Sequence, residues 1–232
     1  TALARLPLVE TLAPHAPPFL QEYAHKRRVP DQVPPPQPAR VARQPPQPLQ
    51  AGPLHPDGRP DLHTGDEVFR VLAPGWSVVP QPIVAHGLVI YNHDYDNPEL
   101  MAVRLGGKGD VTETHVAWRQ KRGAPSTPTP LLIGEDLYYV SDDGIASCVN
   151  AVSGERYWME RLGGNFSASP VFANGHVLFM DETGHATWIK PTRTFETVGK
   201  CEVPGRTLAT PAFANASMYL RTDEFLYRIA AP

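Results

Sequence analysis

Residues 92–99 (NHDYDNPE) are the stretch of the sequence that is richest in side-chain oxygen atoms. Carboxylate and amide oxygens are the ligands that Ca²⁺ prefers, so this stretch is a candidate calcium loop. A helix-loop-helix calcium site needs acids at alternate positions, a central glycine and a glutamate at position twelve, and the stretch lacks that spacing. We therefore expect a solvated hairpin loop here rather than a metal site.

Residues 106–110 (GGKGD) combine glycines with one lysine, a composition found in phosphate-binding loops. Such a loop carries a Lys-Ser or Lys-Thr pair at the start of a helix, whose backbone N–H groups bind the phosphate. Neither the pair nor a helical pattern follows this stretch. The sequence favours a flexible turn.

Other reactive or metal-binding side chains are scattered. No two histidines have the HxH or HxxxH spacing of zinc ligands, and no GxSxG motif marks a serine nucleophile. Cys148 and Cys201 are expected to be buried free thiols, because a disulfide needs Cβ atoms about 4 Å apart. Asn165 and Asn215 begin N-x-S glycosylation triplets, which are common by chance. The sequence thus assigns no catalytic, cofactor-binding or metal-ligating residue. The histidines are His15, His25, His55, His63, His86, His93, His115, His176 and His185.

A four-strand unit recurs along the chain and must position any functional residue. Its clearest copy is Ser126–Gly164, where short apolar runs are separated by Gly, Asp or Ser, a pattern typical of strands. The pattern predicts a four-stranded meander. The expected strands are Leu131–Ile133, Leu137–Val140, Ile145–Val149 and Arg156–Met159.

Prolines mark the start of each copy, at Pro82, Pro130, Pro170 and Pro211. The last two spacings are 40 and 41 residues, and the first is 48, which indicates a loop insertion. Blades of β-propellers repeat at about 40–50 residues, so the sequence predicts an all-β propeller of four-stranded antiparallel blades. The first apolar residue of each second strand follows seven residues after the proline, at Val89, Leu137, Val177 and Met218.

Large and small residues recur with the same period. Trp118 and Trp158 are 40 residues apart, and we expect both to be buried between neighbouring blades. Gly154 stands where the third strand turns tightly into the fourth, which favours a residue that accepts a positive φ. Gly144 and Gly184 have the same role between the second and third strands.

The segments AVSGERYW with LGG, SASPVFANGHVLF and TLATPAFANASMYLRTDEFLYRI resemble the repeat of the PQQ-like (pyrroloquinoline-quinone-type) β-propeller family. That repeat reads roughly A-x-D-x-x-T-G-x-x-x-W, and the resemblance covers about Thr64 to Ile229. It implies a quinoprotein-like propeller, related in architecture to WD40/YVTN-like repeats. The sequence departs from it because Asn150 is displaced from the acidic position, Ser153 replaces Thr, and Val198 replaces Trp in the following copy.

The resemblance implies two alternative functions. One is a non-catalytic, BamB-like scaffold that binds a protein or ligand through its loop face. The other is a fragment of a PQQ-dependent dehydrogenase, a class that carries adjacent cysteines, a tryptophan floor under the quinone and calcium ligands. The chain has no Cys-Cys pair, and its nearest acidic clusters, Asp142-Asp143 and Asp181-Glu182, fall in predicted turns. We therefore favour the scaffold without a cofactor, in the periplasm or at the cell surface, where bacterial relatives of this repeat mostly lie.

Residues 1–60 differ in composition from residues 61–232. They hold 15 of the 27 prolines and seven Lys/Arg against four Asp/Glu. Such a segment buries too little apolar surface to offset its ordering entropy, so it is expected to be disordered or polyproline-like. Two other interpretations are that PPPQP binds an aromatic-lined groove, and that a shifted reading frame produced this segment.

The propeller is expected to span residues 61–232 and to be incomplete, with about four blades. In the alternative, a closed four-bladed ring, the strand at Phe69 would pair with the last blade. Residues 61–232 carry 14 Lys/Arg against 20 Asp/Glu, which argues against a nucleic-acid partner. Apolar runs are far shorter than the roughly 20 residues of a membrane helix, and no secretion signal is recognisable. The expected parts are a blade end at 64–72, blades at 78–121, 127–162 and 168–203, and a partial blade at 209–230.

Overall fold

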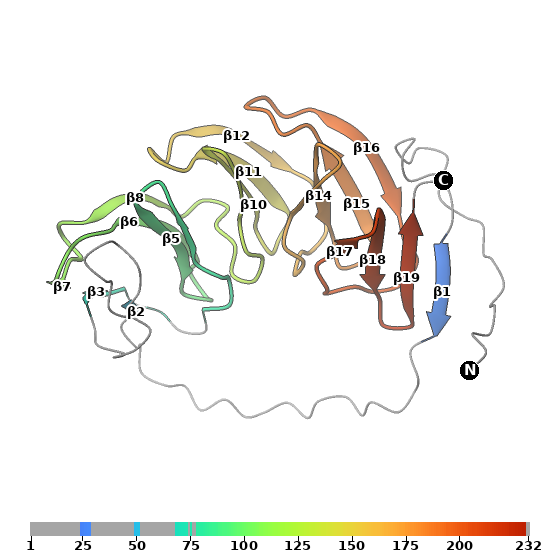
Figure 1. Cartoon of the computed structure of the whole chain (residues 1–232), viewed down its shortest axis with the longest axis horizontal. Helices are drawn as coiled ribbons and strands as arrows, with labels where there is room; N and C mark the ends of the chain where they lie inside the picture. The colour runs from blue at the N-terminus through green and yellow to red at the C-terminus, as the bar shows by residue number, and fades with distance from the viewer. Residues whose placement is uncertain (1–23, 29–48, 52–67, 74, 76–77, 231–232) are drawn as a thin grey trace.

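The computed structural model describes residues 68–73, 75 and 78–230, and the backbone of β1 (Ala24–Arg28) and β2 (Leu49–Ala51). Its described residues form five sheets and no helix. Four sheets are four-stranded and antiparallel, and they stand side by side as the blades of an open arc (Figure 1). The fold is an incomplete β-propeller, as the repeat spacing predicts.

Blades 1 and 2 each place their strands in chain order across the sheet. All four strands predicted within Ser126–Gly164 are present in blade 2. Blade 1 consists of β4 (Ile83–Ala85), β5 (Leu88–His93), β6 (Glu99–Arg104) and β8 (Val116–Gln120), and blade 2 of β9 (Leu131–Ile133), β10 (Asp136–Val140), β11 (Ile145–Asn150) and β12 (Arg156–Arg161).

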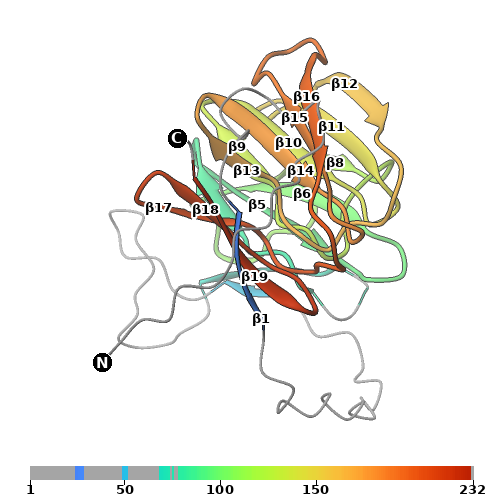
Figure 2. The same cartoon turned by 90° about the vertical axis from the view of Figure 1, so that its right-hand side faces the viewer.

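Blade 3 repeats this order, whereas blade 4 takes three strands from the C-terminal part of the chain and one from the N-terminal part. Figure 2 looks onto blade 4 and shows β1 beside β19. Blade 3 consists of β13 (Val171–Ala173), β14 (His176–Met180), β15 (His185–Ile189) and β16 (Thr197–Glu202), and blade 4 of β17 (Ala212–Ala214), β18 (Ser217–Arg221), β19 (Phe225–Ala230) and β1.

The fourth strand of blade 4 differs from one sequence-based expectation. Ala24 pairs with Ile229 and Arg28 with Phe225, so residues 24–28, within the segment expected to be disordered, form a strand of a blade. The rest of residues 1–60, apart from β2, lies outside the described residues. The strand at Phe69, the other candidate for this place, lies in a different sheet. The edge of β19 needs a partner because unpaired strand edges leave N–H and C=O groups without hydrogen bonds.

A three-stranded sheet covers the face of blade 1 that is turned away from blade 2. In it, β3 (Phe69–Val71) pairs with β2 on one side and with β7 (Gly109–Asp110), in parallel, on the other. The glycine-rich stretch expected as a flexible turn therefore contributes a short strand. The side chains buried under this sheet are Phe69, Val71, Tyr91, Met101, Val103 and Val111.

Alternate residues of the second strands of blades 2 and 3, β10 and β14, pack against opposite neighbours. Leu137 and Tyr139 pack with blade 1, whereas Tyr138 and Val140 pack with blade 3, and all four are fully buried. The core is therefore a series of apolar layers between blades. Cys148 and Cys201 lie in two different layers as buried free thiols, which confirms that prediction. Burial raises the pKa of the Cys148 thiol to about 12.

Trp118 and Trp158 are buried, as predicted, and each connects its blade to the next. Trp118 Nε1 donates to Ala151 O at 2.9 Å, and Trp158 Nε1 donates to Thr192 O at 3.1 Å. Gly154 has the predicted positive φ, 75°, and a Cβ there would lie 2.6 Å from Trp118 Cγ. A residue without a side chain is therefore needed at position 154 both for the positive φ of the turn and for the close packing of the indole ring.

A ladder of hydroxyl groups also links the blades. Gln81 N donates to Thr129 Oγ1 at 3.0 Å, Thr129 N to Ser169 Oγ at 3.0 Å, and Ser169 N to Thr210 Oγ1 at 2.9 Å. Each of these residues directly precedes a proline that marks a repeat. This ladder was not predicted from the sequence, although a hydroxyl residue directly before three of the four repeat prolines is a signal for it.

Candidate binding site

The oxygen-rich stretch forms the end of β5, a turn and the start of β6. His93 Nε2 lies 2.7 Å from Glu99 Oε2, and Arg119 NH1 lies 2.9 Å from the same oxygen. His93 and Glu99 are buried in blade 1. The stretch thus contributes an internal charged cluster. Among the described residues, no group of three or more His, Cys, Asp or Glu side chains is placed to hold a metal ion.

The charges of this cluster change the acidity of Glu99. Burial alone would raise the pKa of this carboxyl group. Hydrogen bonds from His93 and Arg119, together with their charges, outweigh burial and hold the pKa of Glu99 below its ordinary value. Glu99 is therefore a carboxylate at neutral pH, and it stabilises blade 1 in that form.

The acids in the second-to-third strand turns fix loops. One acid in each of these turns accepts a hydrogen bond from the loop that leads into its own blade, which ties that loop to the blade. The hydrogen bonds are Ser126 N to Asp142 Oδ2 at 2.6 Å, Ser167 Oγ to Glu182 Oε1 at 2.7 Å, and Arg206 N to Asp223 Oδ1 at 3.0 Å.

The residues that a quinone cofactor would meet do not fit that group. A quinone of this type is a planar anion that needs cationic partners and a bound Ca²⁺. Both tryptophans at the repeat position are committed to inter-blade contacts. The central residues of the four first strands are all apolar: Val84, Leu132, Phe172 and Phe213.

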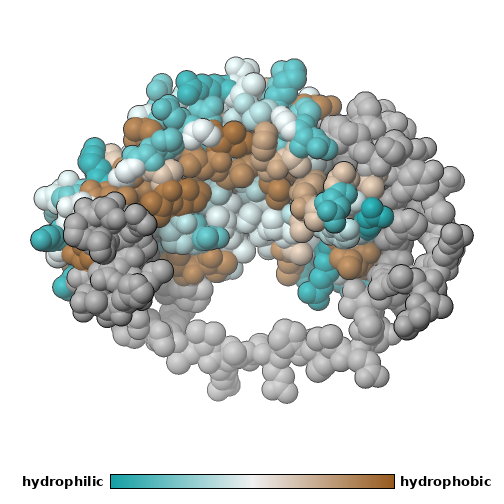
Figure 3. Space-filling model, viewed as in Figure 1, coloured by the Kyte–Doolittle hydropathy of each residue, from teal (hydrophilic) through white to brown (hydrophobic). Residues whose placement is uncertain are grey.

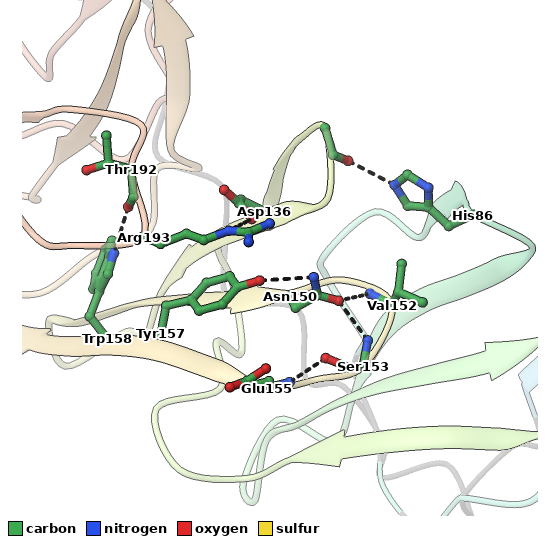
Figure 4. Close-up of polar contacts among 11 residues, drawn as sticks. His86, Asp136, Asn150, Val152, Ser153, Glu155, Tyr157, Trp158, Thr192 and Arg193 are labelled. Atoms are coloured by element: carbon green, nitrogen blue, oxygen red, sulfur yellow. Dashed lines mark hydrogen bonds and ion pairs between the residues drawn. The ribbon is translucent and has the colours of Figure 1, made fainter.

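We call the side of the arc with the first-to-second strand hairpins and third-to-fourth strand turns the hairpin face. Figure 4 shows the contacts that join blades 1, 2 and 3 on it. His86 Nε2 lies 2.8 Å from Gly134 O, and Arg193 Nε donates to Asp136 Oδ1 at 3.0 Å. The Arg193 guanidinium also lies 4.6 Å from the centre of the Tyr157 ring. The first two junctions are thus closed by direct contacts.

The junction between blades 3 and 4 is built differently. In blade 3 the strand register places Gly199 of the fourth strand opposite Trp188 of the third. In blade 2 it places Trp158 of the fourth strand opposite Cys148 of the third. Gly199, and not Val198 as the 40-residue spacing suggested, therefore takes the position of the tryptophan. Compared with blade 2, the large residue is on the third strand of blade 3 and the small residue is on the fourth. The indole of blade 3 therefore comes from Trp188, which is fully buried.

A cleft of about 440 Å³ opens on the hairpin face at this junction. Phe172 and Phe213, which stand two residues after Pro170 and Pro211, are 45% and 37% exposed beside it. No lining residue is charged, and the volume falls within the range of about 300–1,000 Å³ for ligand pockets. The lining residues are Phe172, Ala173, Asn174, Trp188, Phe213, Ala214, Asn215, Ala216, Ser217, Met218 and Ile229.

The arc also shows hydrophobic residues on its surface. In Figure 3 they form a band that follows the arc, while hydrophilic residues gather toward its outer rim. Large exposed apolar side chains on a folded protein are typical of interaction sites when they cluster beside a concavity. The cleft with its two phenylalanines is therefore the best candidate binding site in the described part of the chain.

Comparison with known proteins agrees with this architecture. A family model described as outer membrane protein assembly factor BamB matches residues 108–194. The fold is that of an incomplete β-propeller, and residues 108–194 are similar to the BamB-like form of the PQQ-like propeller repeat. No protein of curated function matches the chain.

Several solved structures share the fold at low sequence identity. BamB from Moraxella catarrhalis is 14% identical with a TM-score of 0.50, over 66% of this chain and 44% of that one. A quinohemoprotein alcohol dehydrogenase from Pseudomonas putida HK5 is 13% identical with a TM-score of 0.53, over 66% and 29%. The computationally designed Ika8 protein is 10% identical with a TM-score of 0.58, over 74% and 51%. The chain thus spans about half or less of these proteins.

Proposed function

We propose that this chain is a non-catalytic PQQ-like propeller that binds a protein or ligand through its hairpin face, with the cleft between blades 3 and 4 as the principal contact. The observation that carries the proposal is the pair of equivalent, half-exposed phenylalanines beside an uncharged cleft. Burying one large apolar side chain stabilises a complex by about 1.5–3 kcal/mol. Two such side chains provide an energetic centre for an interface.

The similarity to an outer membrane protein assembly factor supports a protein as the partner. It also supports a location in the periplasm or at the cell surface. No helix formed by the described residues has the length and hydrophobicity needed to cross a membrane. An uncharged cleft favours a partner that inserts an apolar side chain, because a charged group would lose its hydration there without a compensating ion pair.

Site-specific crosslinking tests the proposal. A photo-crosslinking amino acid at position 213 should capture a partner from cells, whereas the same amino acid at Val84 should not. Val84 is the matched control because it occupies the equivalent position in blade 1 and is 68% exposed. For the purified partner, Phe172→Ala should weaken binding about tenfold and Val84→Ala less than twofold. Equal effects of the two substitutions would contradict the proposal.

A further inference from the structure

The face of blade 4 that is turned away from blade 3 differs from every equivalent face in the arc. We call it the end face, and Tyr219, Arg221, Leu226 and Arg228 form it. In blades 2 and 3 the corresponding face is apolar and buried against the next blade. The equivalent residues are Tyr138, Val140, Ala146 and Cys148 in blade 2, and Leu178, Met180, Ala186 and Trp188 in blade 3.

The end face is exposed and offers mostly hydrogen-bond donors. Arg221 and Arg228 are exposed, and neither forms an ion pair within the described residues. Arg228 Nε donates to Ser217 Oγ at 3.1 Å, which holds its side chain across the sheet. Leu226 is 43% exposed beside them. An arginine pair set around an exposed apolar side chain resembles the centre of a protein interface, where arginine and tyrosine are enriched.

The hydroxyl ladder supplies an independent observation at this end of the arc. Gln81, Thr129 and Ser169 each donate their backbone N–H to a hydroxyl on the following blade. Thr210 is the next member, it is exposed, and its N–H has no acceptor in the described part of the chain. The backbone N–H of Thr210 is therefore a further hydrogen-bond donor at the end face, in addition to the guanidinium groups of Arg221 and Arg228.

A hollow of about 400 Å³ lies where this face meets the loop before blade 4. Arg206, Leu208, Arg221 and Asp223 are among the residues that line it. Arg206 NH2 is paired with Glu182 Oε2 at 3.1 Å, and Asp223 Oδ1 accepts from Arg206 N. Arg221 is thus the lining cation without a carboxylate partner among the described residues. The hollow is large enough for a side chain of a bound polypeptide.

We propose that the end face binds an acidic polypeptide segment of a partner protein, with carboxylates on Arg221 and Arg228 and an apolar side chain on Leu226. Anionic lipid is less suited, because membrane-binding patches gather about 4–8 basic residues. Nucleic acid is disfavoured by the net acidic charge of residues 61–232. Residues 1–60 carry seven Lys/Arg against four Asp/Glu, so the chain's own basic segment is a poor match. This surface is separate from the hairpin-face cleft.

Fluorescence anisotropy with a labelled copolymer of glutamate and tyrosine tests the proposal on the intact chain. The double variant Arg221→Gln/Arg228→Gln should weaken binding about tenfold, because each guanidinium loses a charge-assisted hydrogen bond. The control Lys121→Gln/Lys200→Gln removes the same charge from exposed positions elsewhere and should change binding less than twofold. Arg221→Gln alone should give an intermediate loss, and thermal melting should show all variants folded.

Three outcomes would overturn the proposal. One is that the native chain does not bind the copolymer at low salt. The second is that both double variants weaken binding equally, which would indicate a response to overall charge alone. The third is that the native chain binds vesicles of anionic phospholipid more tightly than the copolymer and that Arg221→Gln/Arg228→Gln abolishes vesicle binding, which would make the partner a membrane surface.

Discussion

The indole ring of Trp118 occupies the space that a side chain at residue 154 would need, since a Cβ on Gly154 would lie 2.6 Å from Trp118 Cγ. The same indole donates to Ala151 O in the turn that contains Gly154. One blade therefore seals its neighbour by placing an aromatic ring against a turn that has no side chain. Packing between blades depends on this pairing of a large residue with a glycine.

Gly154→Ala should lower the free energy of unfolding by about 2–4 kcal/mol, because the methyl group both requires a positive φ and overlaps a buried ring. Gly175→Ala is the matched control, since Gly175 has nearly the same φ, 76°, but no atom within 4 Å of its Cβ position. It should cost about 1 kcal/mol. Urea denaturation measures the free energy of unfolding of both variants. Equal losses would show that the Trp118 indole moves aside at no cost in free energy.

Ala216→Gly should stabilise the chain. Ala216 has a φ of 55° in the first hairpin of blade 4, where the equivalent residues in blades 1 and 3, Gly87 and Gly175, are glycines with positive φ. Relief of this strain exceeds the entropy cost of glycine in the unfolded chain, for a net gain of about 0.5–1 kcal/mol. Ala214→Gly, in the neighbouring strand β17, should instead destabilise by a similar amount. A lower melting temperature for Ala216→Gly would contradict this account.

The charged cluster of blade 1 predicts a pH dependence. The pKa of Glu99 is lowered in the folded state from its ordinary value of 4.5, so its ionised form stabilises the fold. That contribution is present above pH 4.5 and is lost as the pH falls through the lowered pKa. Glu99→Gln should cost about 1–3 kcal/mol at pH 7 and flatten the acid limb of the stability profile.

Glu160→Gln is the control for this measurement. Glu160 is exposed, and within the described structure it forms no hydrogen bond or ion pair from its side chain. Denaturant titrations between pH 3 and 7 should therefore give the same profile for Glu160→Gln as for the native chain. An unchanged acid limb in Glu99→Gln would show that other carboxyl groups cause the loss of stability.

Much of the fold could be predicted from local sequence because the repeat is local. Pro130, Pro170 and Pro211 recur at nearly constant spacing, and the first apolar residue of each second strand lies seven residues later, so strand order follows from the sequence alone. The pairing of β1 with β19 could not be predicted in this way. It joins backbones some 200 residues apart, and backbone hydrogen bonds leave little trace in side-chain pattern.

The candidate site was harder to predict than the blades, because it depends on the register of one strand pair. The 40-residue spacing places Val198 at the tryptophan position. Ile189 pairs with Thr197 where Val149 pairs with Arg156, so the connection between β15 and β16 is one residue longer than that between β11 and β12. Gly199 therefore takes the tryptophan position, and the indole comes from Trp188. A usable signal was present, since Phe172 and Phe213 both follow a repeat proline by two residues. An aromatic residue at a repeated, exposed position indicates binding more than packing.

The last prediction concerns the quinone. We expect that the chain neither binds pyrroloquinoline quinone tightly nor oxidises alcohols with it. The quinone needs a stacking surface, cationic or amide partners and a calcium ion that polarises its reactive carbonyl. The tryptophans at the repeat position are instead held between blades by hydrogen bonds to Ala151 and Thr192, and the central residues of the first strands are apolar.

Titration of the purified chain with quinone and calcium, followed by absorbance and by dye-linked alcohol oxidation, measures both properties. We expect no saturable change of the quinone spectrum at micromolar concentration and no turnover. Trp158→Phe separates the two roles that the indole could have. If the indole only seals the junction, this substitution should lower the free energy of unfolding by about 1–2 kcal/mol, because it removes one buried hydrogen bond and a small volume, and leave the quinone signal unchanged. Micromolar binding that Trp158→Phe abolishes would place the quinone against this ring and would overturn the scaffold function.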